Sequence, residues 1–194
     1  MRAPLTEAEK TALLRFARQS LQAAVQGVGL PFPDPQLSSD RLRQPGASFV
    51  TLTKQGMLRG CIGGLQARMP LDQDVIQHAA AAALDDYRFP PVQPSELKDI
   101  HIEISVLSDP VPLEYRNAQD LIAKLRPGMD GVILTRGLHR ATFLPQVWEK
   151  APHPEAFLSL LCEKAGLAAD AWRRGDLEVL TYQVESLEEM PATG

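Results

Sequence analysis

The chain has 194 residues, of which 44% are hydrophobic and 23% charged, and it contains two cysteines. These values are typical of a globular domain and exclude a disordered chain, a collagen or a disulfide scaffold. Because 20 Lys and Arg residues oppose 24 Asp and Glu residues, the net charge of −4 argues against a general nucleic-acid-binding protein, whose affinity depends on neutralising phosphates.

The N-terminal segment predicts an amphipathic helix. Thr6 and Glu9 have the spacing of a capping box, and apolar side chains recur at helical intervals to about Gln26. No apolar run in the chain has the length of a membrane span, and no signal-peptide pattern precedes the helix, so we expect a cytoplasmic protein. Prolines at alternate positions of residues 31–35 then predict an extended connector.

A β-hairpin is predicted next. Ala47 to Thr53 is rich in β-branched and aromatic residues, Lys54-Gln55-Gly56 supplies a turn, and Met57 to Ile62 forms the second strand. Since side chains alternate across a sheet, Leu58 and Ile62 are expected on one face. Arg59 and Cys61 are then expected on the other face, about 7 Å apart.

The rest of the chain alternates between helices and strands. Helices are predicted over residues 72–84, 117–125, 154–165 and 169–173, and strands over 100–106, 131–135, 140–144 and 177–185. With five or six strands, several of them joined by hairpins, we predict an α+β fold with a mixed or mostly antiparallel sheet and flanking helices.

The predicted helices indicate the surroundings of one cysteine and of two aspartates. Cys162 lies on the apolar face of its helix, which predicts core packing. Asp85 and Asp86 follow the helix over 72–84, where the helix dipole disfavours negative charge. We therefore expect a compensating partner, for which Arg88 is the candidate.

Arg59 and Cys61 carry the strongest chemical signal. A guanidinium beside a thiol favours the thiolate, which is the nucleophilic and oxidisable form. The alternative is a small strand residue beside an arginine whose charged end reaches water.

Gly60, Gly63 and Gly64 allow close main-chain approach or positive φ, so their amides are candidates for an anion-binding nest next to Arg59. A strand end with a bulge explains the glycines equally well. The sequence around them matches neither a Walker A loop nor the dinucleotide fingerprint.

A metal site is not predicted. His101 and Glu103 share one face of a strand, as in zinc deaminases, but the Pro-Cys-x-x-Cys segment of those enzymes is absent. The other histidines are scattered without ligand spacing, so we expect ordinary surface or strand residues.

The hexapeptide Leu58-Arg59-Gly60-Cys61-Ile62-Gly63 resembles the hallmark of the AMMECR domain family, whose bacterial members belong to the AmmeMemoRadiSam system. Further segments resemble family signatures in family order: Arg88-Phe89-Pro90-Pro91-Val92, Ile102 to Ser108, Leu125 to Gly131, Thr142 to Trp148, Leu161 to Leu167 and Ala171-Trp172. The resemblance covers most of the chain from about Ala47. Gly64 stands where many members have threonine, which weakens a hydroxyl role there.

The resemblance implies a single AMMECR domain over residues 1–194. Its larger antiparallel subdomain would contain both termini, and a smaller inserted lobe would form a cleft with it. It also implies two partners, a Memo-like protein related to metal-dependent dioxygenases and a radical S-adenosylmethionine protein. This chain lacks the Cys-x-x-x-Cys-x-x-Cys motif, so any iron–sulfur cluster would belong to that partner and no cofactor is expected.

Three functional hypotheses remain open. In the first, Cys61, activated by Arg59 and with Glu103 as base, acts as a nucleophile or redox thiol on a small substrate. The ligand-binding residues would be Leu58, Gly60, Ile62, Gly63, Arg88, Phe89 and Pro90. In the second, the same cleft binds a protein partner without catalysis. The third, nucleic-acid binding, is disfavoured by the net charge.

Overall fold

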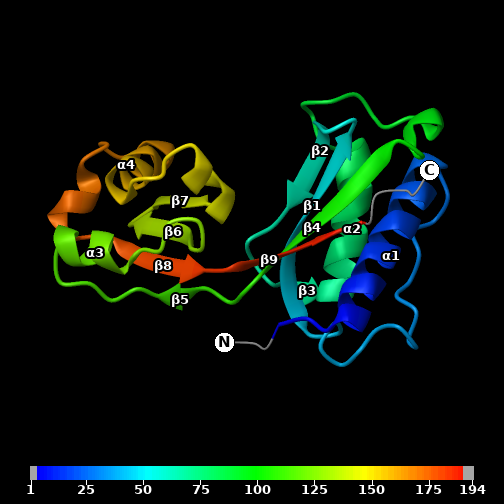
Figure 1. The fold of residues 1–194 in the computed structure, drawn as a ribbon, viewed down its shortest axis with the longest axis horizontal. Coiled ribbons are helices and arrows are strands. Elements are labelled where there is room, and N and C mark those ends of the chain that lie inside the picture. The colour runs from blue at the N-terminus through cyan, green and yellow to red at the C-terminus, as the bar shows by residue number, and fades with distance from the viewer. Residues whose placement is uncertain (1–3, 190–194) are drawn as a thin grey trace. The chain divides into compact units, whose positions relative to one another are not determined.

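The computed structural model describes residues 4–189, which form an α+β fold with two antiparallel sheets (Figure 1). The chain divides into two compact units. Of the described residues, the first unit contains 4–107 and 185–189, and the second contains Ser108–Val184. The predicted α+β class is confirmed.

The first unit contains a five-stranded sheet with strand order β2-β1-β4-β9, with β3 paired to the start of β1. Its elements are α1 (Glu7–Val25), β1 (Pro45–Lys54), β2 (Met57–Gly63), β3 (Met69–Pro70), α2 (Leu71–Leu84), the 3₁₀ turn η1 (Pro94–Glu96), β4 (Ile100–Leu107) and β9 (Val184–Glu188). The predicted capping box of Thr6 and Glu9 begins α1. The hairpin turn has positive φ at Gln55 and Gly56.

Helices α1 and α2 cover one face of this sheet (Figure 1). Alternate residues of the central strands, including Val50, Leu52, Ile102 and Ile104, are fully buried in the core beneath them. The intervening residues of β1, β2 and β4 point to the opposite face, which α1 and α2 leave uncovered.

A β-bulge interrupts the hairpin at Arg59. Leu58 pairs with Thr53 and Gly60 pairs with Leu52, so Arg59 is an extra residue on β2. Leu58 therefore shares the uncovered face with Cys61, whereas Ile62 packs toward the helix-covered core. The prediction that Leu58 and Ile62 share a face is wrong, because the bulge shifts the alternation by one residue.

The second unit contains a sheet of order β5-β8-β6-β7. Its elements are β5 (Val111–Pro112), α3 (Ala118–Lys124), β6 (Gly131–Arg136), β7 (His139–Phe143), the 3₁₀ turn η2 (Pro145–Glu149), α4 (Pro154–Lys164), the 3₁₀ turn η3 (Ala171–Arg174) and β8 (Glu178–Tyr182). Trp148 stacks on Phe157 with ring centroids 3.8 Å apart in the core. Cys162 is fully buried there, as predicted.

The single strand predicted over 177–185 is wrong. It is two strands in two different sheets: β8 pairs with β6, and β9 is the neighbour of β4. The alternating pattern continues through both and gives no sign of the change of sheet. Within residues 4–189, no helix combines the length and apolar character that a membrane crossing requires.

Candidate functional site

Two side chains bind the main-chain N–H and carbonyl groups of Cys61. β2 is an edge strand, and the Cys61 N–H donates to Asp86 Oδ2 at 2.8 Å. Arg88 Nη2 donates to the Cys61 carbonyl oxygen at 3.2 Å. Two groups that an edge strand would leave to solvent are thus fixed in place. We call Asp86 and Arg88 the Cys61 clamp.

The clamp is itself a forked ion pair. Arg88 donates from Nε at 2.8 Å and from Nη2 at 2.6 Å to the two oxygens of Asp86, whose side chain is buried. The Arg88 guanidinium lowers the pKa of Asp86 well below its usual range; burial opposes this effect, and the Cys61 N–H adds to it. Asp86 is therefore ionised at neutral pH. The predicted pairing of Arg88 with this carboxylate is confirmed.

The thiol of Cys61 is partly exposed on the uncovered face of the sheet. The Thr51 hydroxyl donates to Cys61 Sγ at 3.3 Å. Thr51 pairs with Cys61 on one side and with Glu103 on the other, so the three residues form a row across β2, β1 and β4. Because two strand spacings separate them, the main chains of Cys61 and Glu103 lie about 10 Å apart, with the hydroxyl between them.

Arg59 pairs with a carboxylate other than Asp86, the carboxylate of the clamp. It donates to Glu96 from Nε at 3.1 Å and from Nη2 at 2.9 Å, and the two side chains are 13% and 15% exposed. Lys54 Nζ donates to the same carboxylate at 2.9 Å. Hydrogen bonds from Arg59, then from the Gln93 N–H and Lys54, lower the pKa of Glu96 to about 2. Arg59 thus fastens η1 to the hairpin.

The glycines of the hexapeptide are explained by close packing. A Cβ on Gly60 would lie 2.1 Å from the Ala82 carbonyl oxygen, and one on Gly63 would lie 2.3 Å from the Phe49 ring. Neither of them, nor Gly64, has positive φ. Of the two predicted reasons for glycine, close main-chain approach and positive φ, the first therefore accounts for Gly60 and Gly63.

The other predicted binding residues are spread around the clamp. Leu58 is exposed on the face that carries the thiol, whereas Ile62 packs against the core. The Arg88 guanidinium lies 5.6 Å from the Phe89 ring centroid, and Pro90 is exposed. Their neighbour Tyr87 is 95% exposed.

A polar cluster that the sequence reasoning missed joins α2 to β1. His78 Nδ1 lies 3.1 Å from Asp74 Oδ2, and the buried Ser48 hydroxyl donates to the same oxygen at 2.7 Å. The four-residue spacing of Asp74 and His78 on a predicted helix was the available signal. Ser48 is fully buried and its proton is given to the carboxylate, so this cluster is not a serine nucleophile with its base.

Metal ligands do not gather in this region. Across the part of the chain that the structure describes, no group of three or more His, Cys, Asp or Glu side chains is arranged to hold an ion.

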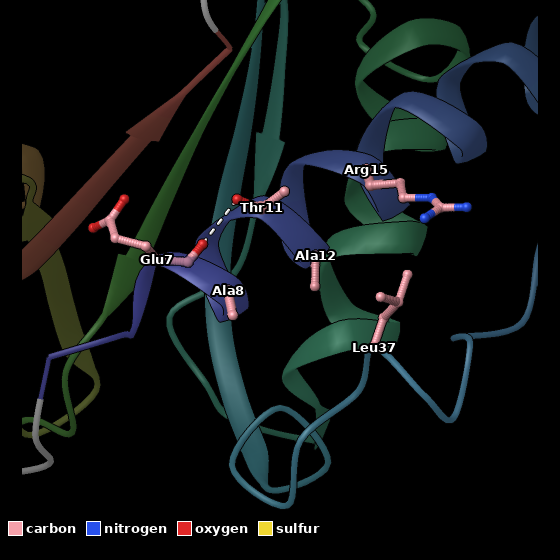
Figure 2. Close-up of a pocket in the computed structure, with 6 residues that line it drawn as sticks. All are labelled: Glu7, Ala8, Thr11, Ala12, Arg15 and Leu37. Atoms are coloured by element: carbon pink, nitrogen blue, oxygen red, sulfur yellow. Dashed lines mark hydrogen bonds between the residues drawn. The ribbon is translucent and has the colours of Figure 1, made fainter.

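The lining of two further cavities does not include Cys61. One of about 370 Å³ on α1 is lined by Glu7, Ala8, Thr11, Ala12, Arg15 and Leu37 (Figure 2). The other, of about 260 Å³ in the second unit, is lined by Ala118, Gln119, Ile122, Ala123, Glu155, Trp172 and Arg173. Neither lining includes a residue of the hexapeptide.

Comparison with known proteins gives consistent matches over nearly the whole chain. The AMMECR1 family model matches residues 14–187. A protein of Methanothermobacter thermautotrophicus is 41% identical over 189 residues, covering 96% of this chain and 97% of its own length. One from Thermofilum pendens is 37% identical over 201 residues, covering 98% and 94%. The crystal structure of the uncharacterized protein PH0010 from Pyrococcus horikoshii is similar with a TM-score of 0.86 at 31% identity, covering 98% of this chain and 96% of that one.

Proposed function

We propose that this chain, which belongs to the AMMECR1 family, acts on a small substrate through the thiol of Cys61. The observation that carries the proposal is the Cys61 clamp. A buried, ionised Asp86 and its paired Arg88 fix both main-chain groups of one residue, and the side chain of that residue stays partly exposed. Reactive groups need such support from rigid neighbours.

The row of Cys61, Thr51 and Glu103 supplies the remaining chemistry. The Thr51 hydroxyl donates a hydrogen bond to Sγ, and in the proposal this bond orients the sulfur toward the substrate. In the proposed step, sulfur forms a bond to an electrophilic carbon of the substrate, and the leaving group departs with its bonding electrons. Glu103, in the same row, is the proposed base that takes up the thiol proton through water, while the Thr51 hydroxyl keeps donating to the sulfur.

In this proposal Arg59 does not activate the thiol, as the sequence-based hypothesis had it. Its Nε and Nη2 donate to Glu96, so Arg59 supports the site by fixing η1 on the hairpin. The hydroxyl of Thr51, which makes the direct contact with sulfur, orients it in the proposal. Phe89 lies next to Arg88 of the clamp, and we propose that these two residues bind the substrate, with an anionic group on Arg88.

Brief treatment of the native protein with iodoacetamide tests the proposal. We expect one adduct, located by peptide mass spectrometry at Cys61, formed faster than the adduct of glutathione under the same conditions. Cys162 is an internal control, since burial raises the pKa of its thiol and shields it from the reagent. Reaction at Cys61 no faster than at glutathione would contradict the proposal.

The second candidate function is that of a protein-binding adaptor. Tyr87 is 95% exposed and precedes the Phe89-Pro90-Pro91 segment, and exposed aromatic residues are typical anchors of protein interfaces. We propose the Memo-like and radical S-adenosylmethionine proteins implied by the family resemblance as partners.

A pull-down of the Memo-like protein separates the two functions. If this chain is an adaptor, Tyr87→Ala and Phe89→Ala abolish capture, whereas Cys61→Ser leaves it unchanged. Tyr87→Ala is the cleaner variant, because the exposed Tyr87 ring contributes little to the folded core. Equal capture by wild type and Tyr87→Ala would argue against an interface at this segment.

A further inference from the structure

The cavity on α1 is an apolar groove with charged residues at its rim. Ala8, Thr11 and Ala12 form its floor, and Leu37 rises toward them from the following loop (Figure 2). The small side chains on α1 leave this space open. Its volume of about 370 Å³ is at the lower end of the range of about 300–1,000 Å³ that is typical of small-molecule pockets.

The segment after α1 presents apolar side chains to solvent. Val28, Leu30 and Phe32 are all exposed, and Phe32 is 93% exposed. Phe32 is the most exposed of the three, and Val28 and Leu30 precede it in the same segment. Pro31 and Pro33 restrict the backbone on both sides of Phe32, which lowers the entropy lost on docking.

Phe32 and the groove residue Leu37 are close along the chain. The Asp34 carbonyl oxygen accepts the N–H groups of Leu37 at 3.0 Å and of Ser38 at 2.9 Å, so a tight turn joins Phe32 to the groove residue Leu37. In a two-fold interface the same surface of each copy contacts the other. A surface that carries both an exposed side chain and a groove therefore lets each copy insert that side chain into the groove of the other.

Two charges near this surface are also complementary. Arg15, at the groove rim, makes no ion pair with any residue between 4 and 189. Asp34 accepts the N–H of Gln36 at 2.9 Å and likewise forms no ion pair within that range. Asp34 follows Phe32 by two residues, so a docked Phe32 would bring Asp34 to the rim.

We propose that two copies of this chain form a two-fold symmetric dimer through these surfaces. Phe32 of each copy occupies the groove between α1 and Leu37 of the other, and Asp34 of each copy pairs with Arg15 of the other. The proposal is independent of the role of Cys61.

Sedimentation velocity from low micromolar to a few hundred micromolar protein tests the dimer. We expect the wild type to dimerise and Phe32→Ser to weaken dimerisation about 30-fold or more, as for an interface anchor. Leu138→Ser, which removes a fully exposed apolar side chain from the second unit, should dimerise like the wild type.

Charge reversal identifies the contact. Arg15→Asp and Asp34→Arg should each weaken the dimer, and the double variant should restore it. A wild type that is monomeric throughout the concentration range would overturn the proposal. So would a dimer that Phe32→Ser leaves unchanged, since another surface would then form it.

Discussion

At the residue scale, Cys61 and Arg59 are fixed by different carboxylates. Asp86 binds the main chain of Cys61, and Glu96 binds the guanidinium of Arg59. The two carboxylates therefore have separate effects. Asp86 positions the thiol of the proposed site, whereas Glu96 holds η1 against the hairpin and contributes to stability.

Acid should reveal the contribution of Glu96. Its pKa is about 2 in the folded protein against an ordinary value of 4.5, so the unfolded chain takes up the proton first as the pH falls. The free energy of unfolding should therefore decrease between about pH 4.5 and pH 2, and Asp86, whose pKa is also lowered, acts in the same direction. Urea titrations at several pH values measure this decrease.

Arg59→Ala is the informative variant for that titration. It removes the largest cause of the low pKa of Glu96, so stability should be lower at pH 7 by about 2–4 kcal/mol and should change less on acidification. Lys54→Met is the matched control, because Lys54 is more exposed and its loss should cost under about 1 kcal/mol. A pH profile of Arg59→Ala parallel to that of the wild type would contradict this assignment.

At the element scale, the contact of β2 with α2 determines where the hexapeptide lies. The absence of a side chain at Gly60 brings the Ala82 carbonyl against the strand, and four residues later Asp86 reaches the Cys61 N–H. The clamp depends on this close approach, since a helix held further from β2 would carry Asp86 away from the Cys61 N–H.

Two glycine substitutions test the contact. Gly60→Ala places a Cβ 2.1 Å from a main-chain oxygen that cannot rotate away, so it should destabilise the fold by about 2–3 kcal/mol or more. In Gly64→Ala the new Cβ meets His78 at an ordinary 3.8 Å, so stability should stay within about 0.5 kcal/mol of wild type. Thermal and urea unfolding of both variants measures the difference, and equal stabilities would rule out the close contact.

The elements that were predictable are those with local signals. The capping box of α1, the hairpin and the Asp86–Arg88 pair each depend on residues a few positions apart. The bulge at Arg59 has no such signal, because the pairing of β1 with β2 determines it. The bond of Arg59 to Glu96 spans 37 positions, and the Cys61–Thr51–Glu103 row depends on register across three strands.

At the scale of the whole molecule, the chain has two cores and the proposed chemistry belongs to one of them. Cys61, Thr51, Glu103 and the clamp are all in the first unit, whereas Cys162 is buried in the core of the second. Family resemblance located the hexapeptide, but the sequence could not distinguish a reactive cysteine from a packed one. That distinction depends on burial and on partners supplied by distant residues.

The rate of Cys61 alkylation by iodoacetamide at neutral pH, in wild type, Thr51→Val and Thr51→Ser, tests the central claim most directly. Valine matches threonine in shape without the hydroxyl, so we predict a rate about three- to tenfold lower, as expected from the loss of one hydrogen bond to sulfur. Thr51→Ser should retain most of the wild-type rate. Equal rates in all three proteins, or a wild-type rate no higher than that of glutathione, would contradict a thiol prepared for reaction.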